Sequence, residues 1–344
     1  MNNFAEISDM LKTLCNAKGV SGAENESAIV ASEMLGKYMP VRTDVLGSVT
    51  GRKEGKGPHI LLDAHLDQIG LIVTAVDSDG FLKFTKCGGA DRRVLTAAEV
   101  TVHGKEKLFG VVTSTPPHLE KPEEASKALS FDAMAIDIGL SKEEAEKLVS
   151  AGDRVTFNGG YLQLMGNRVS SPSVDDRAGV AAVLRCLEIL EKKGIDCNLS
   201  VMFSVQEETG GSGAKAAAFA AEADEAIAVD VSFASAPSVS AEKYASLGKG
   251  TMIGFAPSLD YAMSKKLEVI AKRESIPYQL EVMGGKTGTN CDDIQVAGKG
   301  VKTALLSVPL RNMHTACEVC DLEDIENTAR LMAEYIAERS KENA

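Results

Sequence analysis

The chain has 344 residues and a formal net charge of −12 at pH 7, and 44% of its residues are hydrophobic, 25% charged and 5% aromatic. This length accommodates two domains, and the composition is typical of a folded globular protein rather than a disordered one. An acidic balance without a cluster of lysine and arginine argues against nucleic acid as a partner, and the lack of tryptophan argues against a surface that stacks bases or sugars.

The first part of the chain predicts two helices, one short strand and then a β-rich unit. The elements ahead of this unit are expected at 3–17, 24–38 and 59–62. From about 71 to 157, short alternating or β-branched runs are separated by turn signals, a pattern typical of strands. One helix is expected inside this unit at 141–149, with Ser141 as its cap and Glu144 at the matching position of a capping box.

After about residue 170, strands and helices alternate. The expected helices lie at 175–193, 211–221, 260–275 and 322–338. The expected strands lie at 198–205, 225–231, 277–282 and 301–308. This alternation is typical of an α/β fold, with a mainly parallel sheet covered by helices on both faces. We therefore predict a discontinuous catalytic domain at 1–70 and 163–344, interrupted by an inserted small β-rich domain at 71–162.

Two further features bear on the compartment. Residues 1–19 lack the basic and apolar segments of a signal peptide, and the apolar runs fall short of the ~18 residues that a membrane span needs, so we expect a cytoplasmic protein without membrane partners. The seven cysteines are scattered, which predicts no disulfide framework. Cys317 and Cys320 form a single C-x-x-C, interpreted as packing residues or, alternatively, as a redox or metal pair.

Strong metal-ligating side chains follow the apolar strands at the point where each strand ends. These side chains are His65, Asp67, Glu207, Glu208, Asp230 and His314, and Asp175 and Asp176 begin a helix. One such residue is most often a cap or turn residue. In open α/β sheets, however, binding sites lie beyond the carboxyl ends of the strands, so the combination at five places predicts one site.

This set of side chains fits a particular chemistry. Two histidines with several carboxylates, and no thiol, suit a pair of divalent ions about 3.5 Å apart better than one structural zinc. Three carboxylates and a bridging hydroxide would balance the charge of the two ions. Hydrolysis also needs a base that is not a ligand. Because adjacent side chains of an extended chain point in opposite directions, one of Glu207 and Glu208 can bind metal while the other acts as base.

Five segments in this order resemble the tetrahedral (TET) aminopeptidases, a cytosolic family of dinuclear metallopeptidases that includes glutamyl aminopeptidases and members described as endoglucanases. The segments are DAHLDQIG, SVDDRAG, VQEETGGSGA, AVDV and SVPLRNMHT. The β-rich unit is similar as well, in GGADRRVL, VVTSTPPHL, AIDIGLSKEEA and GDRVTF. The resemblance spans about residues 11 to 335. It implies that the insertion makes dimer contacts and that six dimers close into a hollow dodecamer.

The resemblance also assigns the metal ligands. His65 and Asp230 would bind the first ion, Glu208 and His314 would bind the second, and Asp175 would bridge both. The family's first aspartate lies four residues before a glycine, here Gly179, which selects Asp175. Asp176 would then cap the helix, where its charge suits the positive N-terminal end.

Two further residues receive catalytic roles from the resemblance. Glu207 is the general base, and Asp67 takes the other ring proton of His65 and sets its tautomer. The implied cofactors are two divalent ions per subunit, with Zn²⁺ preferred and Co²⁺ or Mn²⁺ as alternatives.

Some positions depart from the family pattern. Gln68 stands where relatives usually have Glu, and Cys291 and Asp292 are not the residues expected in a loop near the substrate. The segment at 314–320 keeps His314 and Glu318, while its cysteines replace ordinary small or apolar residues.

We predict an aminopeptidase that releases N-terminal residues from short peptides, using a metal-bridging water that Glu207 deprotonates. One alternative is a glycoside hydrolase, which needs two carboxyl groups and no metal but does not explain the histidines at strand ends. The other is a non-catalytic scaffold, against which the intact Glu207 argues. The preferred N-terminal residue and the native metal stay open.

Overall fold

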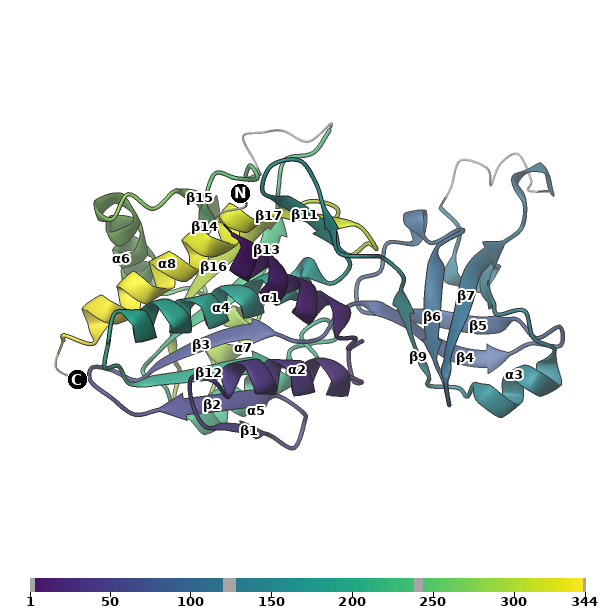
Figure 1. The fold of residues 1–344 in the computed structure, drawn as a ribbon, viewed down its shortest axis with the longest axis horizontal. Coiled ribbons are helices and arrows are strands. Elements are labelled where there is room, and N and C mark those ends of the chain that lie inside the picture. The colour runs from purple at the N-terminus through teal and green to yellow at the C-terminus, as the bar shows by residue number, and fades with distance from the viewer. Residues whose placement is uncertain (1–3, 120–127, 238–243, 343–344) are drawn as a thin grey trace.

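The computed structural model describes residues 4–119, 128–237 and 244–342. A large α/β unit and a small closed β-barrel lie side by side in the long direction of the molecule (Figure 1). The chain enters the barrel after the strand Ile60–His65 and leaves it after the strand Arg154–Phe157. The barrel therefore lies beyond the carboxyl end of a central strand of the large sheet.

The large sheet has eight strands in the order β1-β2-β12-β3-β13-β16-β14-β15. Their bounds are β1 (Val41–Thr43), β2 (Val49–Lys53), β3 (Ile60–His65), β12 (Leu199–Ser204), β13 (Glu225–Phe233), β14 (Thr251–Phe255), β15 (Tyr278–Val282) and β16 (Lys302–Leu310). The central strands β12, β3, β13 and β16 are mutually parallel. Antiparallel pairs flank them, β2 with β12 and β14 with β16. The predicted α/β class with a mainly parallel sheet is confirmed.

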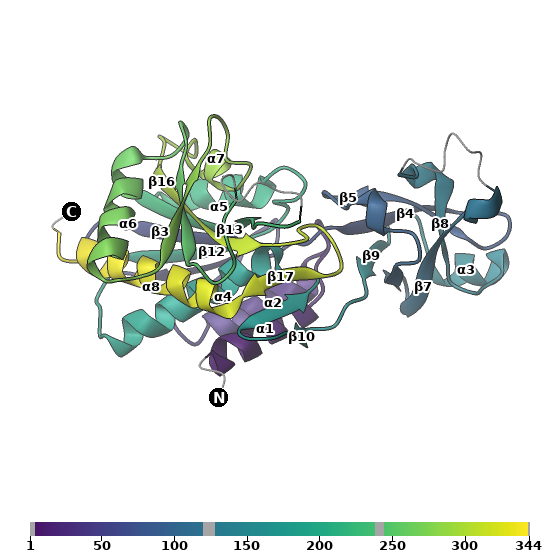
Figure 2. The same cartoon turned by 90° about the horizontal axis from the view of Figure 1, so that it is seen from above.

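Helices cover both faces of this sheet (Figure 2). One face carries α1 (Ala5–Asn16), α2 (Asn25–Leu35), α4 (Val174–Lys192), α6 (Tyr261–Arg273) and α8 (Leu322–Arg339). The other carries α5 (Ser212–Ala221) and α7 (Cys291–Ile294). In β3, Leu62 packs into the first core and its neighbour Leu61 into the second, because successive side chains of a strand point to opposite faces. The central strands are continuous apolar runs for this reason.

The barrel is antiparallel and closed, in the order β4-β5-β8-β7-β6-β9. Its strands are β4 (Gly70–Val76), β5 (Leu82–Cys87), β6 (Glu99–His103), β7 (Lys107–Ser114), β8 (Met134–Asp137) and β9 (Arg154–Phe157). Its helical turns are η1 (Arg92–Val94), η2 (Pro117–Leu119), η3 (Phe131–Ala133) and α3 (Lys142–Leu148). The predicted capping box is present, since the Ser141 amide donates to Glu144 Oε2 over 3.1 Å. The barrel has an apolar core of its own.

A third, three-stranded sheet pairs β10 (Leu162–Gln163), β11 (Arg168–Ser171) and β17 (Glu318–Asp321) in antiparallel fashion. Strand β11 leads into α4, and β17 follows the segment that carries His314. The pairing of Ser171 with Glu318 therefore holds the start of α4 beside that segment. The sequence patterns did not predict this sheet.

The predicted helices and strands of the α/β unit are present with shifted ends, except that residue 3 lies outside the described part. The strands β1, β2 and β14 were not predicted. Strands β1 and β2 are short and expose polar side chains, and β14 contains Gly254, so none of them has a strong apolar alternation. Of the helices described, none combines the length and apolar character that crossing a membrane requires.

Candidate metal centre at the carboxyl edge of the sheet

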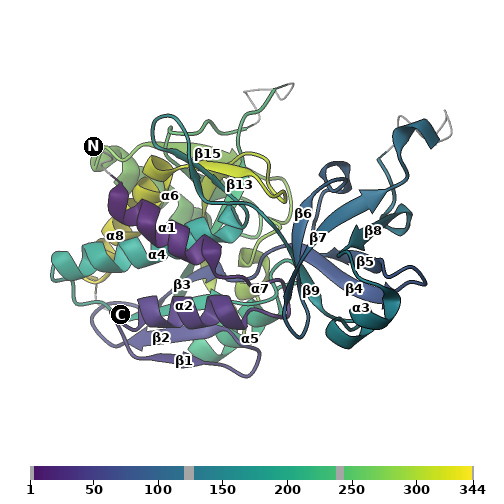
Figure 3. The same ribbon diagram turned by 45° about the vertical axis from the view of Figure 1, so that its right-hand side comes forward.

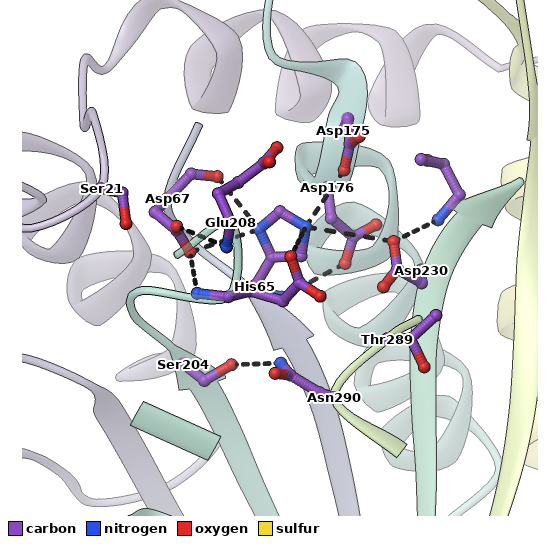
Figure 4. Close-up of polar contacts among 12 residues, drawn as sticks. Ser21, His65, Asp67, Asp175, Asp176, Ser204, Glu208, Asp230, Thr289 and Asn290 are labelled. Atoms are coloured by element: carbon purple, nitrogen blue, oxygen red, sulfur yellow. Dashed lines mark hydrogen bonds and ion pairs between the residues drawn. The ribbon is translucent and has the colours of Figure 1, made fainter. Parts of the chain in front are cut away.

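The five side chains expected to bind metal lie together beyond the carboxyl ends of the central strands. They form two groups of three whose candidate ligand atoms lie within 4.8 Å of one another, and Asp175 belongs to both. The first group is His65, Asp175 and Asp230, and the second is Asp175, Glu208 and His314. Figure 4 shows the ring of His65 among the carboxylates of this cluster.

Asp175 presents a different oxygen to each histidine. His65 Nε2 lies 3.1 Å from Asp175 Oδ1, and His314 Nε2 lies 3.3 Å from Asp175 Oδ2. Asp230 Oδ1 lies 4.0 Å from His65 Nε2, and Glu208 Oε1 lies 3.4 Å from His314 Nε2. The two histidines thus share Asp175 while each also faces other carboxylates, which is the arrangement that a bridging ligand needs.

Asp67 orients the ring of His65 mainly through its backbone carbonyl. His65 Nδ1 lies 3.0 Å from the backbone carbonyl oxygen of Asp67 and 3.5 Å from its carboxylate Oδ1. The carbonyl oxygen is the closer acceptor for the Nδ1 proton, which leaves Nε2 free to act as a ligand. The carboxylate of Asp67 instead accepts the backbone amides of Glu207 and Glu208, over 2.9 and 3.1 Å.

Glu207 and Glu208 lie in a turn after β12, so the expectation that strand alternation separates them is wrong. Gln206 ahead of them has a positive φ of 60°, which bends the chain away from the strand. The two amides that bind Asp67 hold the turn. Gly210 and Gly211 continue it with φ values of 121° and 70°, which favour glycine.

Two acids near the centre accept hydrogen bonds from backbone amides of the candidate ligands. Glu318 is buried, and its carboxylate accepts the amide of Asp175 over 3.0 Å and that of His314 over 2.8 Å. Asp176 accepts the amide of Gly179 over 3.0 Å and therefore caps α4, as expected. Its second oxygen accepts the amide of His65 over 3.2 Å. The sequence analysis noted Glu318 only as a family residue and gave it no role.

The donor set fits divalent cations. Glu208 Oε1 is buried and accepts no hydrogen bond from the described residues, although His314 Nε2 is 3.4 Å away. Burial and the charges of Glu208 and Asp67 raise the pKa of Glu207 to about 7. Burial and the charge of Asp176 raise the pKa of Asp230 well above its usual range. Carboxylates crowded in this way repel one another unless cations compensate their charge. Imidazole and carboxylate groups together are ligands that Zn²⁺, Co²⁺ and Mn²⁺ bind.

The barrel closes one side of the centre at two glycines. A Cβ on Gly89 would lie 2.3 Å from His314 Nδ1, and a Cβ on Gly88 would lie 3.2 Å from the Cβ of Glu208. Only residues without side chains allow this close approach. Figure 3 shows the barrel beside the large α/β unit. A cavity of about 460 Å³, called here the inner cavity, opens beside the ligands and is lined by Glu207, Asp230 and residues of β13, β15 and β16.

A buried polar triad next to the centre was missed by the sequence analysis. Asp63 on β3 accepts the hydroxyl of Ser204 over 2.9 Å and the side-chain amide of Asn290 over 2.8 Å. The amide of Asn290 also donates to the Ser204 hydroxyl over 2.8 Å (Figure 4). Asn290 ends the loop at 284–290, whose Thr287 and Thr289 line the inner cavity. The triad therefore ties a wall of the cavity to the strand that carries His65. An aspartate within an otherwise apolar strand was the available signal.

The positions that depart from the family pattern have local partners. Gln68 is buried and accepts the amide of Gly19 over 3.3 Å. Asp292 accepts the amides of Thr287 and Gly288, over 3.2 and 2.9 Å, and so shapes the same loop.

The cysteines take no part in the centre. All seven are free, and Cys291 is buried in the smaller core of the sheet. Cys320 is buried in the larger core whereas Cys317 is exposed. The packing interpretation of the C-x-x-C therefore holds for Cys320.

The sequence matches a family of known enzymes over most of its length. The model of the family described as M42 glutamyl aminopeptidase matches residues 47–331. A lysyl aminopeptidase of Pyrococcus furiosus is 32% identical over 336 residues, which cover 96% of each chain.

Solved structures of similar proteins have the same architecture. A TET aminopeptidase from a marine sediment thaumarchaeon superposes with a TM-score of 0.93 at 30% identity, covering 98% of this chain and 99% of that one. The TET1 peptidase of Pyrococcus horikoshii, described as assembling into a tetrahedron or a large octahedral shell, superposes with a TM-score of 0.83 at 31% identity, covering 96% of this chain and 99% of that one.

Proposed function

The chain belongs to the M42 glutamyl aminopeptidase family and is an aminopeptidase, and we propose that it releases N-terminal residues from short peptides with a dinuclear metal centre. His65, Asp175 and Asp230 would hold one divalent ion, and Asp175, Glu208 and His314 the other. The observation that carries this proposal is the position of Asp175, whose two oxygens face the two histidines at 3.1 and 3.3 Å. Bound ions would act as Lewis acids on the scissile carbonyl and on water.

Glu207 is the residue that we assign as general base. It lies at the wall of the inner cavity, and its Oε2 is 4.0 Å from His65 Nε2. It belongs to neither group of three candidate ligands, so its carboxylate stays free to take a proton from the attacking water and to pass it to the leaving amine. The turn held by Asp67 keeps this carboxylate beside the centre.

The glycoside hydrolase alternative is less well supported by the side chains. It requires a pair of carboxyl groups that act as acid and base or nucleophile. Here Asp175, Glu208 and Asp230 each lie within a group that includes a histidine, and Glu318 is occupied by two backbone amides. The family match places the chain among peptidases.

Removal of metal is expected to abolish peptidase activity reversibly. Dialysis against a chelator should lower kcat/KM for an aminoacyl p-nitroanilide by about 10³-fold or more, because a metal contributes several kcal/mol to the transition state. Addition of Zn²⁺, Co²⁺ or Mn²⁺ should restore activity and identify the preferred metal. Activity on peptides or on a β-glucan that persists in the metal-free protein would contradict the proposed centre.

We further propose that the chain assembles into a homo-oligomer through its barrel, with a dodecamer as the expected form. Structurally similar proteins, such as the TET1 peptidase of Pyrococcus horikoshii, assemble into closed shells. Sedimentation equilibrium should give a mass about twelve times the chain mass of 36.3 kDa. A species with the mass of one chain at micromolar concentration would exclude the shell.

A further inference from the structure

The inner cavity extends from the metal centre along one face of the sheet. Its floor is formed by side chains from three strands of the large sheet, namely Asp230 and Ser232 of β13, Leu305 and Ser307 of β16, and Glu281 of β15. Asp230 pairs in register with Ser307, and alternate residues of a strand share a face, so these side chains point to the same side. A polar row thus leads from a candidate metal ligand to Glu281.

Gly254 makes this row possible. It lies on β14, which separates β16 from β15, and is paired in register with Glu281. A Cβ on Gly254 would lie 3.0 Å from the Cβ of Leu305. Without that side chain the floor is open, and Glu281 reaches across β14 to accept the hydroxyl of Ser307 over 2.9 Å and that of Ser232.

Among the described residues, no cationic side chain compensates the charge of Glu281. No lysine or arginine of the described residues forms an ion pair with it or lines the inner cavity. Its carboxylate lies in a partly buried position, and its hydrogen-bond partners among the described residues are the two serine hydroxyls. A partly buried carboxylate with neutral partners favours the approach of a cation.

The opposite side of the centre has the opposite charge. A second cavity of about 530 Å³ shares Gly89, Met313 and His314 with the inner cavity and extends along the barrel. Its lining includes Lys86 and Arg92, both exposed, and Asp91, whose carboxylate is paired with Arg93. A cationic side chain would be repelled on the barrel side and attracted on the Glu281 side.

We propose that Glu281 is a specificity-determining residue, and that the inner cavity receives the side chain of an N-terminal lysine or arginine. The long aliphatic stem of either residue would lie against Leu305 of the lining, while its charged end would meet Glu281. This inference rests on the proposed aminopeptidase function and adds the class of substrate.

The test compares lysyl, arginyl, norleucyl and glutamyl p-nitroanilides. Norleucine has the same carbon chain as lysine but no ammonium group, so the ratio of kcat/KM for lysine to that for norleucine isolates the charge. This ratio should exceed one in the wild type. In Glu281→Gln it should fall by about 10- to 100-fold, because a hydrogen bond between charged groups is lost while the shape of the side chain is kept. The same substitution at the exposed Glu54 is the charge-matched control and should leave the ratio unchanged.

Three results would overturn the proposal. One is an unchanged ratio in Glu281→Gln, and another is a wild type that prefers the norleucyl or glutamyl substrate; both leave the aminopeptidase function intact. The third is inactivity of the metal-loaded wild type on all four substrates, which would remove the proposed function together with this inference. Competitive inhibition by the free amino acids gives a second measurement. Free L-lysine should inhibit Glu281→Gln more weakly than the wild type, and inhibition by L-norleucine should weaken less.

Discussion

Replacement of Glu207 by glutamine is expected to lower kcat by about 10²- to 10⁴-fold, the contribution of a positioned general base. Glutamine keeps the size of the side chain and its backbone amide still donates to Asp67, so the turn after β12 should persist. The amide group cannot accept a proton at neutral pH, so proton transfer to the leaving amine is lost. Steady-state kinetics with an aminoacyl substrate measures the change in kcat.

The metal content of the two neighbouring variants distinguishes their roles. Glu207→Gln should retain the wild-type number of ions by elemental analysis, because Glu207 belongs to neither ligand group. Glu208→Gln should lose metal, because Glu208 belongs to the second ligand group and its buried Oε1 accepts no hydrogen bond from the described residues. Substantial turnover in metal-loaded Glu207→Gln would contradict the assignment of the base. If Glu208→Gln kept its full metal content and Glu207→Gln lost metal, Glu207 would be the ligand and Glu208 the base.

Replacement of Asp175 by asparagine is expected to weaken binding of both ions at once and to lower kcat/KM by about 10³-fold or more. Asp175 is the one residue common to both groups of candidate ligands in the described part of the chain. Asparagine keeps the backbone amide that donates to Glu318, so local structure should survive. Calorimetric titration of the metal-free variant with Zn²⁺ should show the loss, and a variant that still binds two ions tightly would contradict a shared ligand.

Asp176→Asn is the matched control for this experiment. Asp176 lies next to Asp175 and is also buried, but its oxygens accept the amides of Gly179 and His65 instead of facing the histidine rings. Burial raises the pKa of Asp176 well above its usual range, so loss of its negative charge costs little, although the asparagine side chain keeps only one of the two acceptor oxygens. We expect near-normal metal content in Asp176→Asn. If Asp176→Asn lost both ions while Asp175→Asn still bound them, Asp176 would be the shared ligand and Asp175 would not.

Much of the centre could be predicted because parallel strands bring their carboxyl ends to the same edge of a sheet. His65, Glu208 and Asp230 each follow an apolar run that the sequence identifies as a strand, and these runs became β3, β12 and β13. The choice of Asp175 over Asp176 needed the family pattern as well, since both begin the same helix. The barrel was predicted only as a β-rich unit, because closure depends on pairing between strands far apart in the chain.

What the sequence by itself determined was the chemistry at the carboxyl edge: two histidines and several acids at strand ends, in an α/β chain with a β-rich insertion. Only the tertiary structure decided which of these groups contact one another. Asp67 holds the turn of Glu207 and Glu208, which lie 140 and 141 residues away in the chain, and Glu281 crosses Gly254 to reach Ser307. Such contacts depend on strand order, register and the absence of a side chain between two strands. Periodicity along the chain carries no information about them, because it reports only which face of an element is buried.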